Sequence, residues 1–377
     1  MLSKNFSGTG GGAERYSIAL VEQMAGRHQV HVYAQTIEHW MPGVTYTRVS
    51  CPLNRPRWVN QLWFAGATWW ATRRGFDIVH SHENTWHGNI QTVHVLPVKH
   101  NLFANKRGWP LAMRWLKVLT SPRLASYLWL EKMRYRPLVG RLVVLASTTL
   151  RDFMLRSYPD AALAMRVIAP GVENVPGAST ADTREQARQR LGLPRHGWCV
   201  LFVGNDLRKK GLPSLLGAIA TLPADVWVAV VGKNGPDSSM AADIQAYGLR
   251  ERVHFLGSQR DMGVAYRAAD CLAHPTLEDT FAMVVLEAMA HGLPVIVSNQ
   301  SYCGIAAELQ TGVNAMILDT PRDPVELAHK LESLLAKPLQ AAAMVAAGLD
   351  FAKSRTWSGA AQAYEDAYTE ALKLHAK

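Results

Sequence analysis

The segment His274–Ser298 restricts the fold of this chain more than any other stretch of its sequence. It reads as the end of a strand, an acidic loop, a helix whose apolar residues from Val284 to Ala290 follow helical spacing, and a stop at Gly292. The apolar run that follows, Leu293–Val297, lacks polar alternation and is typical of a buried strand in a parallel sheet. The segment therefore predicts a strand, a helix and a second strand of an α/β domain.

Two carboxylates flank the start of this predicted helix. Asp279 lies in the loop, and Glu287 follows eight residues later, two helical turns on, so we expect both to face one cleft. The helix start between them has backbone N–H groups without helical partners, and these attract anions. Such a site suits a sugar nucleotide, in which polar rings are joined by a diphosphate. The alternative interpretation is a pair of surface acids beside a core helix.

The segment resembles the E-x7-E signature of glycosyltransferase family 4, a group of retaining enzymes with the GT-B fold. Alignment on Phe281 and Glu287 places Asp279, and not Glu278, at the first acidic position, so this chain has D-x7-E. In the family the first acid binds hydroxyls of the donor sugar, the second binds the nucleotide ribose, and the amides between them bind phosphate. The resemblance therefore implies a donor-binding role for Asp279, Phe281, Ala282, Met283, Val284 and Glu287. The shorter Asp is expected to move the sugar slightly.

The length of 377 residues predicts two domains, and 48% hydrophobic with 19% charged residues describes a globular chain with ample core. The stretch Glu173–Asp182, rich in Gly, Pro, Ser and Thr, is interpreted as the linker. The predicted fold class is α/β, of GT-B type. It has two Rossmann-like domains facing a cleft, 1–175 for the acceptor and 176–355 for the nucleotide sugar. The resemblance implies that a last helix at 356–377 packs back on the N-terminal domain.

Strands and helices alternate along both halves, which implies parallel sheets covered by helices. The predicted elements of the first half are strands Gln29–Ala34, Phe76–His80, Ile90–His94 and Leu142–Ala146, and helices Glu14–Met24 and Trp58–Arg73. The predicted strands of the second half are Cys199–Val203, Val226–Val231, Val253–Leu256, Cys271–His274, Pro294–Val297 and Ala315–Leu318. The tail Ala341–Leu374 is predicted to be helical, with Trp357 inside it. A full first strand before the glycine loop is missing, so either that strand is cut short or the natural start lies upstream.

The glycine loop, Gly8–Gly12, leads straight into a helix that carries Glu14. Glycine lets the backbone approach a ligand closely, and a helix start favours phosphate. Glycine-rich turns are also common at helix starts without a ligand. The loop resembles the GG-x-E loop of the family, which lies against the donor phosphate and the acceptor. The resemblance therefore implies donor binding by Gly11 and Gly12 and acceptor binding by Glu14.

The basic loop, Gly204–Gly211, follows a predicted strand and opens a helix. Its cations lie at the carboxyl edge of the sheet, where open α/β folds bind ligands. The loop resembles the family's G-R-x4-K-G pattern, in which an Arg and a Lys neutralise the donor diphosphate. Lys210 matches the family Lys, but Asn205 stands at the Arg position, so the second cation is expected to be Arg208 or Lys209. A solvated basic loop is the alternative.

Histidines follow two of the predicted strands. His80 and His82 share one strand face and would allow a metal site, which we disfavour because GT-B enzymes need no divalent ion and no acidic ligands accompany them. His94 resembles the T-x-H position of the family, whose His contacts the donor sugar and the leaving phosphate. We therefore predict His94, Asp279 and Lys210 as the catalytic residues, with no metal. His82 is either an acceptor-side residue or a structural one.

Positive charge is concentrated in the first half of the chain. Residues 1–177 contain 21 Lys and Arg against 9 Asp and Glu, whereas the remainder contains 19 against 21. The densest stretch, Lys99–Arg136, interleaves cations with Trp and Tyr, which suits the surface of an anionic bilayer. The predicted membrane residues are Lys106, Arg107, Trp109, Arg114, Trp115 and Lys117. RNA would fit the same chemistry, and an ordinary basic face is a further alternative.

The four cysteines lack disulfide or zinc-ligand spacing, which favours reduced thiols in a cytosolic setting. We find no secretory signal and no apolar run long enough to span a bilayer, so binding at the inner face of the cytoplasmic membrane is expected to be peripheral.

The resemblance, which extends from Gly10 to Trp357, implies a retaining, metal-independent glycosyltransferase without a cofactor. It would move a sugar from a UDP- or GDP-linked donor to a lipopolysaccharide or lipid-linked glycan. Tyr302-Cys303-Gly304 resembles the subgroup that glucosylates the lipopolysaccharide inner core. The absence of an evident protein nucleophile fits a front-face displacement, in which positioning and stabilisation of the leaving diphosphate supply the catalysis. The alternatives are a sugar-nucleotide 2-epimerase on the same fold and a non-catalytic RNA-binding or adaptor protein.

Overall fold

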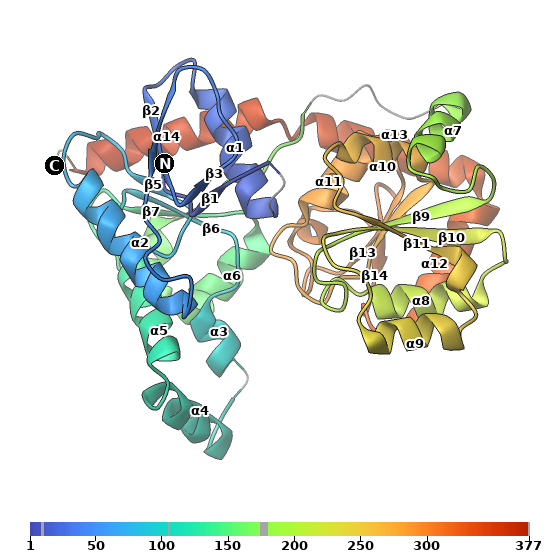
Figure 1. The fold of residues 1–377 in the computed structure, drawn as a ribbon, viewed down its shortest axis with the longest axis horizontal. Helices are drawn as coiled ribbons and strands as arrows, with labels where there is room; N and C mark the ends of the chain where they lie inside the picture. The colour runs from blue at the N-terminus through green and yellow to red at the C-terminus, as the bar shows by residue number, and fades with distance from the viewer. Residues whose placement is uncertain (9–10, 105, 174–179, 376–377) are drawn as a thin grey trace. The chain divides into compact units, whose positions relative to one another are not determined.

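The computed structural model describes residues 1–8, 11–104, 106–173 and 180–375. The chain divides into two compact units (Figure 1). Unit 1 comprises Met1–Pro170 and the C-terminal Trp357–Lys377, and unit 2 comprises Gly171–Thr356.

Unit 2 is built on six parallel strands in the order β11-β10-β9-β12-β13-β14. Their bounds are β9 Trp198–Val203, β10 Val226–Val231, β11 Val253–Gly257, β12 Cys271–His274, β13 Val295–Ser298 and β14 Met316–Leu318. Every residue of β10, β12 and β13 is buried, as expected for parallel strands covered by helices on both faces. The six predicted strands of this half are therefore confirmed, with ends shifted by one residue at most.

The helices of unit 2 pack on this sheet or on one another. They are α7 Ala181–Arg190, α8 Leu212–Thr221, α9 Ser238–Ala246, α10 Met262–Ala268, α11 Met283–Ala290, α12 Pro324–Ala336 and α13 Pro338–Lys353. On one face, α8 and α12 pack side by side, and Leu215 and Leu331 have no exposed surface. This core fixes the strand ends that carry the site loops.

The strands of unit 1 also run parallel, in shorter pieces. Their bounds are β1 Asn5–Phe6, β2 Val30–Ala34, β3 Thr36–Ile37, β4 Val44–Arg48, β5 His80–Ser81, β6 Ile90–Val93, β7 Leu142–Leu145 and β8 Met165–Val167. Leu2 joins the pieces, because its backbone bridges Tyr33 in β2 on one side and Ser81 in β5 on the other. The first residues of the chain thus occupy the place of the strand that was expected before the glycine loop.

Seven helices are described in unit 1: α1 Gly12–Met24, α2 Arg57–Thr72, α3 Val98–Phe103, α4 Trp109–Leu119, α5 Pro122–Arg134, α6 Thr148–Ser157 and α14 Trp357–His375. The C-terminal α14 packs against α1, so the last helix returns to the N-terminal unit as the family resemblance implied. Figure 1 shows α4 at the far end of a projection formed with α3 and α5, away from the sheet of unit 1.

The predicted strand Phe76–His80 is largely wrong, because the strand is limited to His80–Ser81. Val79 gives its N–H to the side chain of Asn89, and its carbonyl accepts from the Asn89 and Ile90 backbones in a turn-like arrangement. Phe76 is exposed and Ile78 and Val79 are only partly buried, so the run that suggested a strand is not a fully buried one.

Two helix boundaries also differ from prediction. The tail is two helices, and the break at Ser354–Thr356 occurs because the backbone of Arg355 accepts from Val172. Trp357 begins α14 instead of lying inside one long helix. The predicted linker overlaps α7, which begins at Ala181 with Thr180 as its N-cap, and residues 174–179 of that linker lie outside the described residues.

Within the described ranges, no single helix has both the length and the apolar character needed to cross a membrane. The sharply bent pair of helices α12 and α13 would together be long and apolar enough, judged by length and composition alone.

Candidate functional site

The loops after β9 and β12 meet at the carboxyl edge of the unit 2 sheet. β9 is hydrogen-bonded to β10 on one side and to β12 on the other, so the strand order reverses its direction between β9 and β12. Open α/β sheets bind their ligands at such a switch point. The basic loop Gly204–Gly211 follows β9, and the acidic loop after His274 follows β12.

The two loops are held in close contact. Leu277 donates its N–H to the carbonyl of Lys209 at 2.8 Å. Gly211 has a φ of +87°, and a Cβ built there would lie 1.8 Å from the carbonyl oxygen of Pro275, so only glycine fits. The sequence thus requires Gly211 for the approach that brings basic and acidic side chains together.

Asp279 is the centre of this arrangement. Its Oδ2 lies 2.5 Å from Lys210 Nζ and 3.2 Å from His274 Nε2, and its Oδ1 accepts the Ala282 N–H at 2.9 Å. Burial alone would raise the pKa of the Asp279 carboxyl, but the hydrogen bond from His274 and the charge of Lys210 together hold that pKa below its usual range. Asp279 is therefore ionised at neutral pH and paired with Lys210.

The helix that follows starts from a strained residue. Ala282, the N-cap of α11, has φ +75° and ψ +68°, in the left-handed region that glycine occupies at low cost. Such strain is typical of functional sites. The first turn of α11 contains Met283 and Val284, both partly buried, and its N–H groups have no helical partners. This helix start can bind an anion.

Glu287 lies further along α11, where its Oε2 accepts a hydrogen bond from the Tyr266 hydroxyl at 2.5 Å. The backbone of the first acid is fixed separately, since Asp279 donates its N–H to the Tyr302 carbonyl and accepts from the Gly304 N–H. Tyr302 and Gly304, noted in the sequence for their resemblance to a subgroup, therefore support the acidic loop. Phe281 is buried beside them.

Each cation of the basic loop pairs with a different acid. Arg208 makes two hydrogen bonds to Asp237, of 2.8 and 2.9 Å, and Lys209 Nζ lies 2.8 Å from Glu278 Oε1. At the position of the family Arg, the side chain of Asn205 accepts the Lys233 N–H. The structure thus brings Lys210 to Asp279, Lys209 to Glu278 and Arg208 to the start of α9.

The glycine loop of unit 1 is described in part, because Gly10 lies outside the described residues. Gly11 is the N-cap of α1 and Gly12 its first residue. A Cβ at Gly11 would lie 3.1 Å from Glu14 Oε2, so the Glu14 carboxylate folds back over the helix start. The structure places Gly11, Gly12 and Glu14 at the start of α1, and the donor and acceptor roles expected of them stay predictions.

The histidines of unit 1 form a buried cluster. His82 Nδ1 lies 2.8 Å from His94 Nε2. His80 bonds through Nδ1 to the Tyr368 hydroxyl at 2.8 Å and through Nε2 to Thr92 Oγ1 at 2.7 Å. The hydroxyls of Thr92, Tyr364 and Tyr16 continue this network, with 2.9 Å between successive oxygens. The two tyrosines from α14 had no signal in the sequence that placed them here.

These histidines are neutral at physiological pH. Burial, and then the neighbouring His80 and His94, lower the pKa of His82 well below its usual value. Burial and then the Arg134 guanidinium lower the pKa of His94 to about 3. Among the residues that the structure describes, no three His, Cys, Asp or Glu side chains are grouped so as to hold a metal ion.

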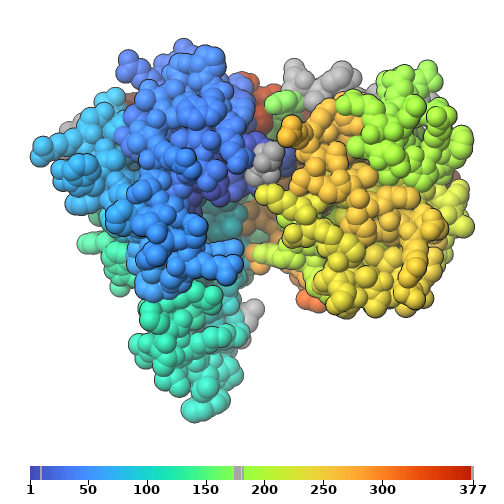
Figure 2. Space-filling model, in the orientation of Figure 1, coloured from blue at the N-terminus to red at the C-terminus, as the bar shows by residue number. Residues whose placement is uncertain are grey.

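The predicted membrane residues lie on the projection of unit 1, which Figure 2 shows as a protruding surface. Trp109 is 76% exposed and Trp115 is 50% exposed, both on α4. Lys106 and Arg107 precede this helix, while Arg114 and Lys117 lie on it. Lys117 and Arg107 are exposed, and Lys106 and Arg114 are partly buried.

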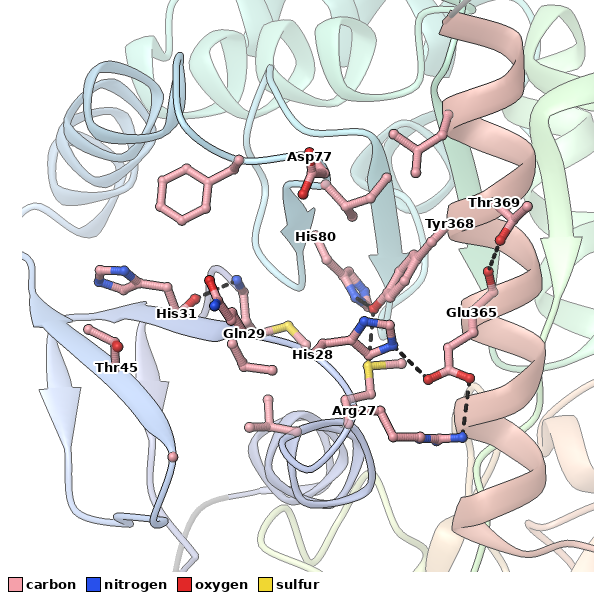
Figure 3. Close-up of a pocket in the computed structure, with 18 of the residues that line it drawn as sticks. Arg27, His28, Gln29, His31, Thr45, Asp77, His80, Glu365, Tyr368 and Thr369 are labelled. Carbon is pink, nitrogen blue, oxygen red and sulfur yellow. Dashed lines mark hydrogen bonds and ion pairs between the residues drawn. The ribbon is translucent and has the colours of Figure 1, made fainter.

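A separate cavity of about 1000 Å³ lies in unit 1 between the end of α1, β2 and α14 (Figure 3). On one side, Glu365 pairs with Arg27 and His28, and His80 and Tyr368 close the inner end. None of the predicted site residues lines it.

Two family profiles match the chain in tandem. "Glycosyltransferase Family 4" matches residues 10–174, and "Glycosyl transferases group 1" matches residues 183–350. The first covers most of unit 1, and the second covers most of unit 2, including both site loops.

Curated relatives match over shorter stretches. The D-inositol 3-phosphate glycosyltransferase of Corynebacterium diphtheriae is 32% identical over 237 residues, which is 59% of this chain and 54% of that protein. The lipopolysaccharide glucosyltransferase WaaG of Escherichia coli is 28% identical over 214 residues, 54% of this chain and 55% of that protein. The chain thus spans about half the length of the curated relatives it matches.

Solved structures match over nearly the whole chain. WaaG, a glycosyltransferase involved in lipopolysaccharide biosynthesis, has a TM-score of 0.82 at 20% identity and covers 97% of this chain and 98% of its own. HepE of Anabaena, solved in complex with UDP and glucose, has a TM-score of 0.74 at 18% identity and covers 97% of both chains. These likenesses show the GT-B fold. With both family profiles matched in order, the chain belongs to glycosyltransferase family 4.

Proposed function

We propose that this protein transfers a sugar, with retention of its anomeric configuration, from a UDP- or GDP-linked donor to a lipopolysaccharide or lipid-linked glycan. The observation that carries the proposal is the ion pair of Lys210 and Asp279 at the switch point of unit 2, beside the start of α11. The pair supplies a cation for the diphosphate and a carboxylate for sugar hydroxyls. The amides of Met283 and Val284, in the first turn of α11, supply the anion site.

In this proposal the chemistry rests on positioning and charge. The Lys210 ammonium and the amides of α11 stabilise the negative charge that develops on the leaving diphosphate. Glu287 is oriented by Tyr266 and binds the ribose hydroxyls. His94 contacts the donor sugar and the leaving phosphate, and the leaving phosphate accepts the acceptor's proton. No metal ion or further cofactor takes part.

The acceptor proposal rests on the surface of unit 1. Aromatic residues at the bilayer interface and cations near anionic headgroups both favour peripheral binding. The projection offers both kinds of residue, with Trp109 and Trp115 exposed among four cations. A protein held at the inner face of the cytoplasmic membrane in this way would meet a lipid-linked acceptor there.

The test of the transfer reaction is a panel of UDP- and GDP-hexoses incubated with a lipid-linked or lipopolysaccharide-core acceptor, with products read by mass spectrometry and NMR. We expect one donor to be consumed together with acceptor, an unchanged anomeric configuration and no inhibition by EDTA. An inverted product would contradict the mechanism. Conversion of the donor sugar to its 2-epimer without consumption of acceptor would favour the epimerase alternative.

The test of the membrane proposal is flotation with vesicles of neutral or anionic lipid. Replacing Lys106, Arg107, Arg114 and Lys117 with Gln should release the protein from anionic vesicles, because each cation near the surface contributes about 1 kcal/mol. The matched control replaces four exposed cations of unit 2 with Gln, namely Arg190, Arg195, Arg250 and Lys353. Equal binding to neutral vesicles, or equal release by the control, would contradict the proposal, and salt-sensitive RNA binding without vesicle binding would replace it.

A further inference from the structure

The bond between His82 and His94 has a geometry that fixes both rings. The two imidazoles are within 13° of one plane, their centroids are 5.1 Å apart, and the joining nitrogens are 2.8 Å apart. A hydrogen bond between ring nitrogens is strongest in this in-plane, edge-to-edge arrangement. His82 follows β5 and His94 follows β6, and these neighbouring parallel strands hold the two residues at the same edge of the sheet.

Because both rings are neutral, the bond contains one proton, and two tautomer arrangements are possible. In the first, His82 donates from Nδ1, and His94 has its proton on Nδ1. In the second, His94 donates from Nε2, and His82 has its proton on Nε2. Among the described residues, His82 Nε2 is buried and has no hydrogen-bond partner. The second arrangement would therefore bury an unpaired N–H, which proteins avoid more strongly than an unpaired acceptor.

The surroundings of His82 hold its ring in place. The ring of His80 lies over it with centroids 4.5 Å apart and a 26° angle between the planes. His80 is itself fixed at both nitrogens by Tyr368 and Thr92. Tyr16 packs on the cluster from α1, with its ring centroid 5.9 Å from that of His82 and 5.0 Å from that of His94. A rigid His82 can therefore impose an orientation on His94.

We propose that His82 is a positioning residue, which donates from Nδ1 to His94 Nε2 and thereby holds His94 in the tautomer that has its proton on Nδ1. His94 then has an N–H, and not a lone pair, at Nδ1, which is the form that can donate to an oxygen of a phosphate or a sugar hydroxyl. The consequence for transfer rests on the proposed function of His94. The tautomer itself does not depend on any ligand.

The direct test is NMR of protein labelled with ¹⁵N-histidine, in which the signals of His94 are assigned from their loss in the His94→Gln variant. We expect a pyrrole-type Nδ1 and a pyridine-type Nε2 for His94 in the wild-type protein without ligand. His82→Leu should abolish this preference. A His94 with its proton on Nε2 in the wild type would overturn the proposal, whether or not the protein transfers sugar.

The functional test compares His82→Asn with His82→Leu. The two side chains have nearly the same shape, but only Asn places an N–H donor where His82 Nδ1 lies. We expect His82→Leu to lower kcat about 3- to 10-fold, the effect of one hydrogen bond between neutral groups, and to change KM for the sugar donor less. His82→Asn should recover most of the wild-type kcat.

The control pair is His28→Asn and His28→Leu, at an exposed histidine of the same unit, with melting temperatures confirming that all variants are folded. Equal losses in His82→Asn and His82→Leu would show a packing role only and overturn the proposal. A wild-type kcat in folded His82→Leu would do the same. A wild-type protein that consumes no nucleotide sugar would instead contradict the proposed function, and the NMR result would still decide the tautomer.

Discussion

The two loops that meet at the carboxyl edge of the unit 2 sheet are joined by ion pairs, whereas the histidine cluster at the same edge of unit 1 is joined by hydrogen bonds between neutral rings and hydroxyls. Lys210 and Asp279 pair at 2.5 Å in unit 2, and Lys209 and Glu278 pair beside them. In unit 1, His82 and His94 are joined by a neutral hydrogen bond. Charged side chains suit a diphosphate, because a bound diphosphate can take the place of an acidic side chain as the ionic partner of a lysine. Neutral donors can contact hydroxyls without the cost of burying an unpaired charge.

The difference between the units is expected to be largest in acid. Each histidine with a folded pKa below 6.5 binds fewer protons in the folded than in the unfolded protein. Its contribution to stability is unaffected above pH 6.5 and is lost as the pH falls toward the folded pKa. Burial, followed by the charge of Arg141, lowers the pKa of His87 to about 4, so this residue alone should cost about 3 kcal/mol at pH 4. His80, His82 and His94 add to the loss.

Hydrogen exchange read by mass spectrometry between pH 7 and pH 4, corrected for intrinsic rates, measures this loss peptide by peptide. Peptides of unit 1 should lose protection first. In unit 2, three histidines have a lowered pKa, and only His274 among them is fully buried. Earlier loss of protection in unit 2 would show that the histidine cluster does not control acid stability.

Removal of the central cation tests the ionic site. Lys210→Ala should lower the transfer rate by about 10- to 100-fold, because a charge-assisted hydrogen bond contributes about 1.5–3 kcal/mol. Glu287→Ala should lower the transfer rate by a similar factor. Steady-state kinetics with the preferred sugar donor measure both, and Lys353→Ala, in an exposed pair with Asp350, is the control. A folded Lys210→Ala variant that transfers sugar at the wild-type rate would show that the diphosphate does not bind at Lys210 of unit 2.

The relative effects of substituting the neighbouring acids Glu278 and Asp279 test which of them is the first acid of the D-x7-E motif. Asp279→Asn should reduce transfer about tenfold, because the amide replaces the charge that Lys210 and His274 face. Glu278→Gln should change it by about threefold at most, since Glu278 pairs with Lys209 in a partly exposed contact. The transfer rates of both variants are measured at saturating donor. A larger loss of rate in Glu278→Gln than in Asp279→Asn would place the first acid of the motif at Glu278.

The smallest expected effect concerns backbone strain in unit 2. Ala282→Gly should raise the free energy of unfolding by about 1 kcal/mol or less, because glycine adopts the φ of +75° without a Cβ clash. Ala288→Gly, inside α11, should lower it by about 1 kcal/mol or more. Denaturant midpoints of the two variants measure the difference. Destabilisation by both would show that residue 282 is not strained.

Most of unit 2 could be predicted from the sequence because its strands are buried on both faces. Val226–Val231 is a continuous apolar run, and the structure places β10 at those residues. In unit 1, β4 could not be predicted in this way, because only β2 pairs with it and its five residues are partly or fully exposed. The break before Trp357 was also missed, since it depends on pairing between Arg355 and Val172, far apart in the chain.

The site was predictable to the extent that it follows from parallel strand ends. Lys210 follows β9 and Asp279 follows β12, so a sheet with these strands adjacent brings them together. The pairing of Arg208 with Asp237 was not predictable, because it depends on the start of α9. The same is true of Tyr364 and Tyr368, which reach the histidines from α14 across more than 270 residues of sequence.

The central claim is that unit 2 binds the diphosphate of a nucleotide sugar through Lys210 and the start of α11. The most direct measurement is isothermal titration of the wild-type protein and Lys210→Ala with UDP, GDP and their hexose conjugates. We expect one nucleotide series to bind the wild type, and Lys210→Ala to weaken this binding at least about tenfold, through the loss of one charge-assisted hydrogen bond. Equal affinity in the two proteins, or a wild type that binds neither series, would contradict it.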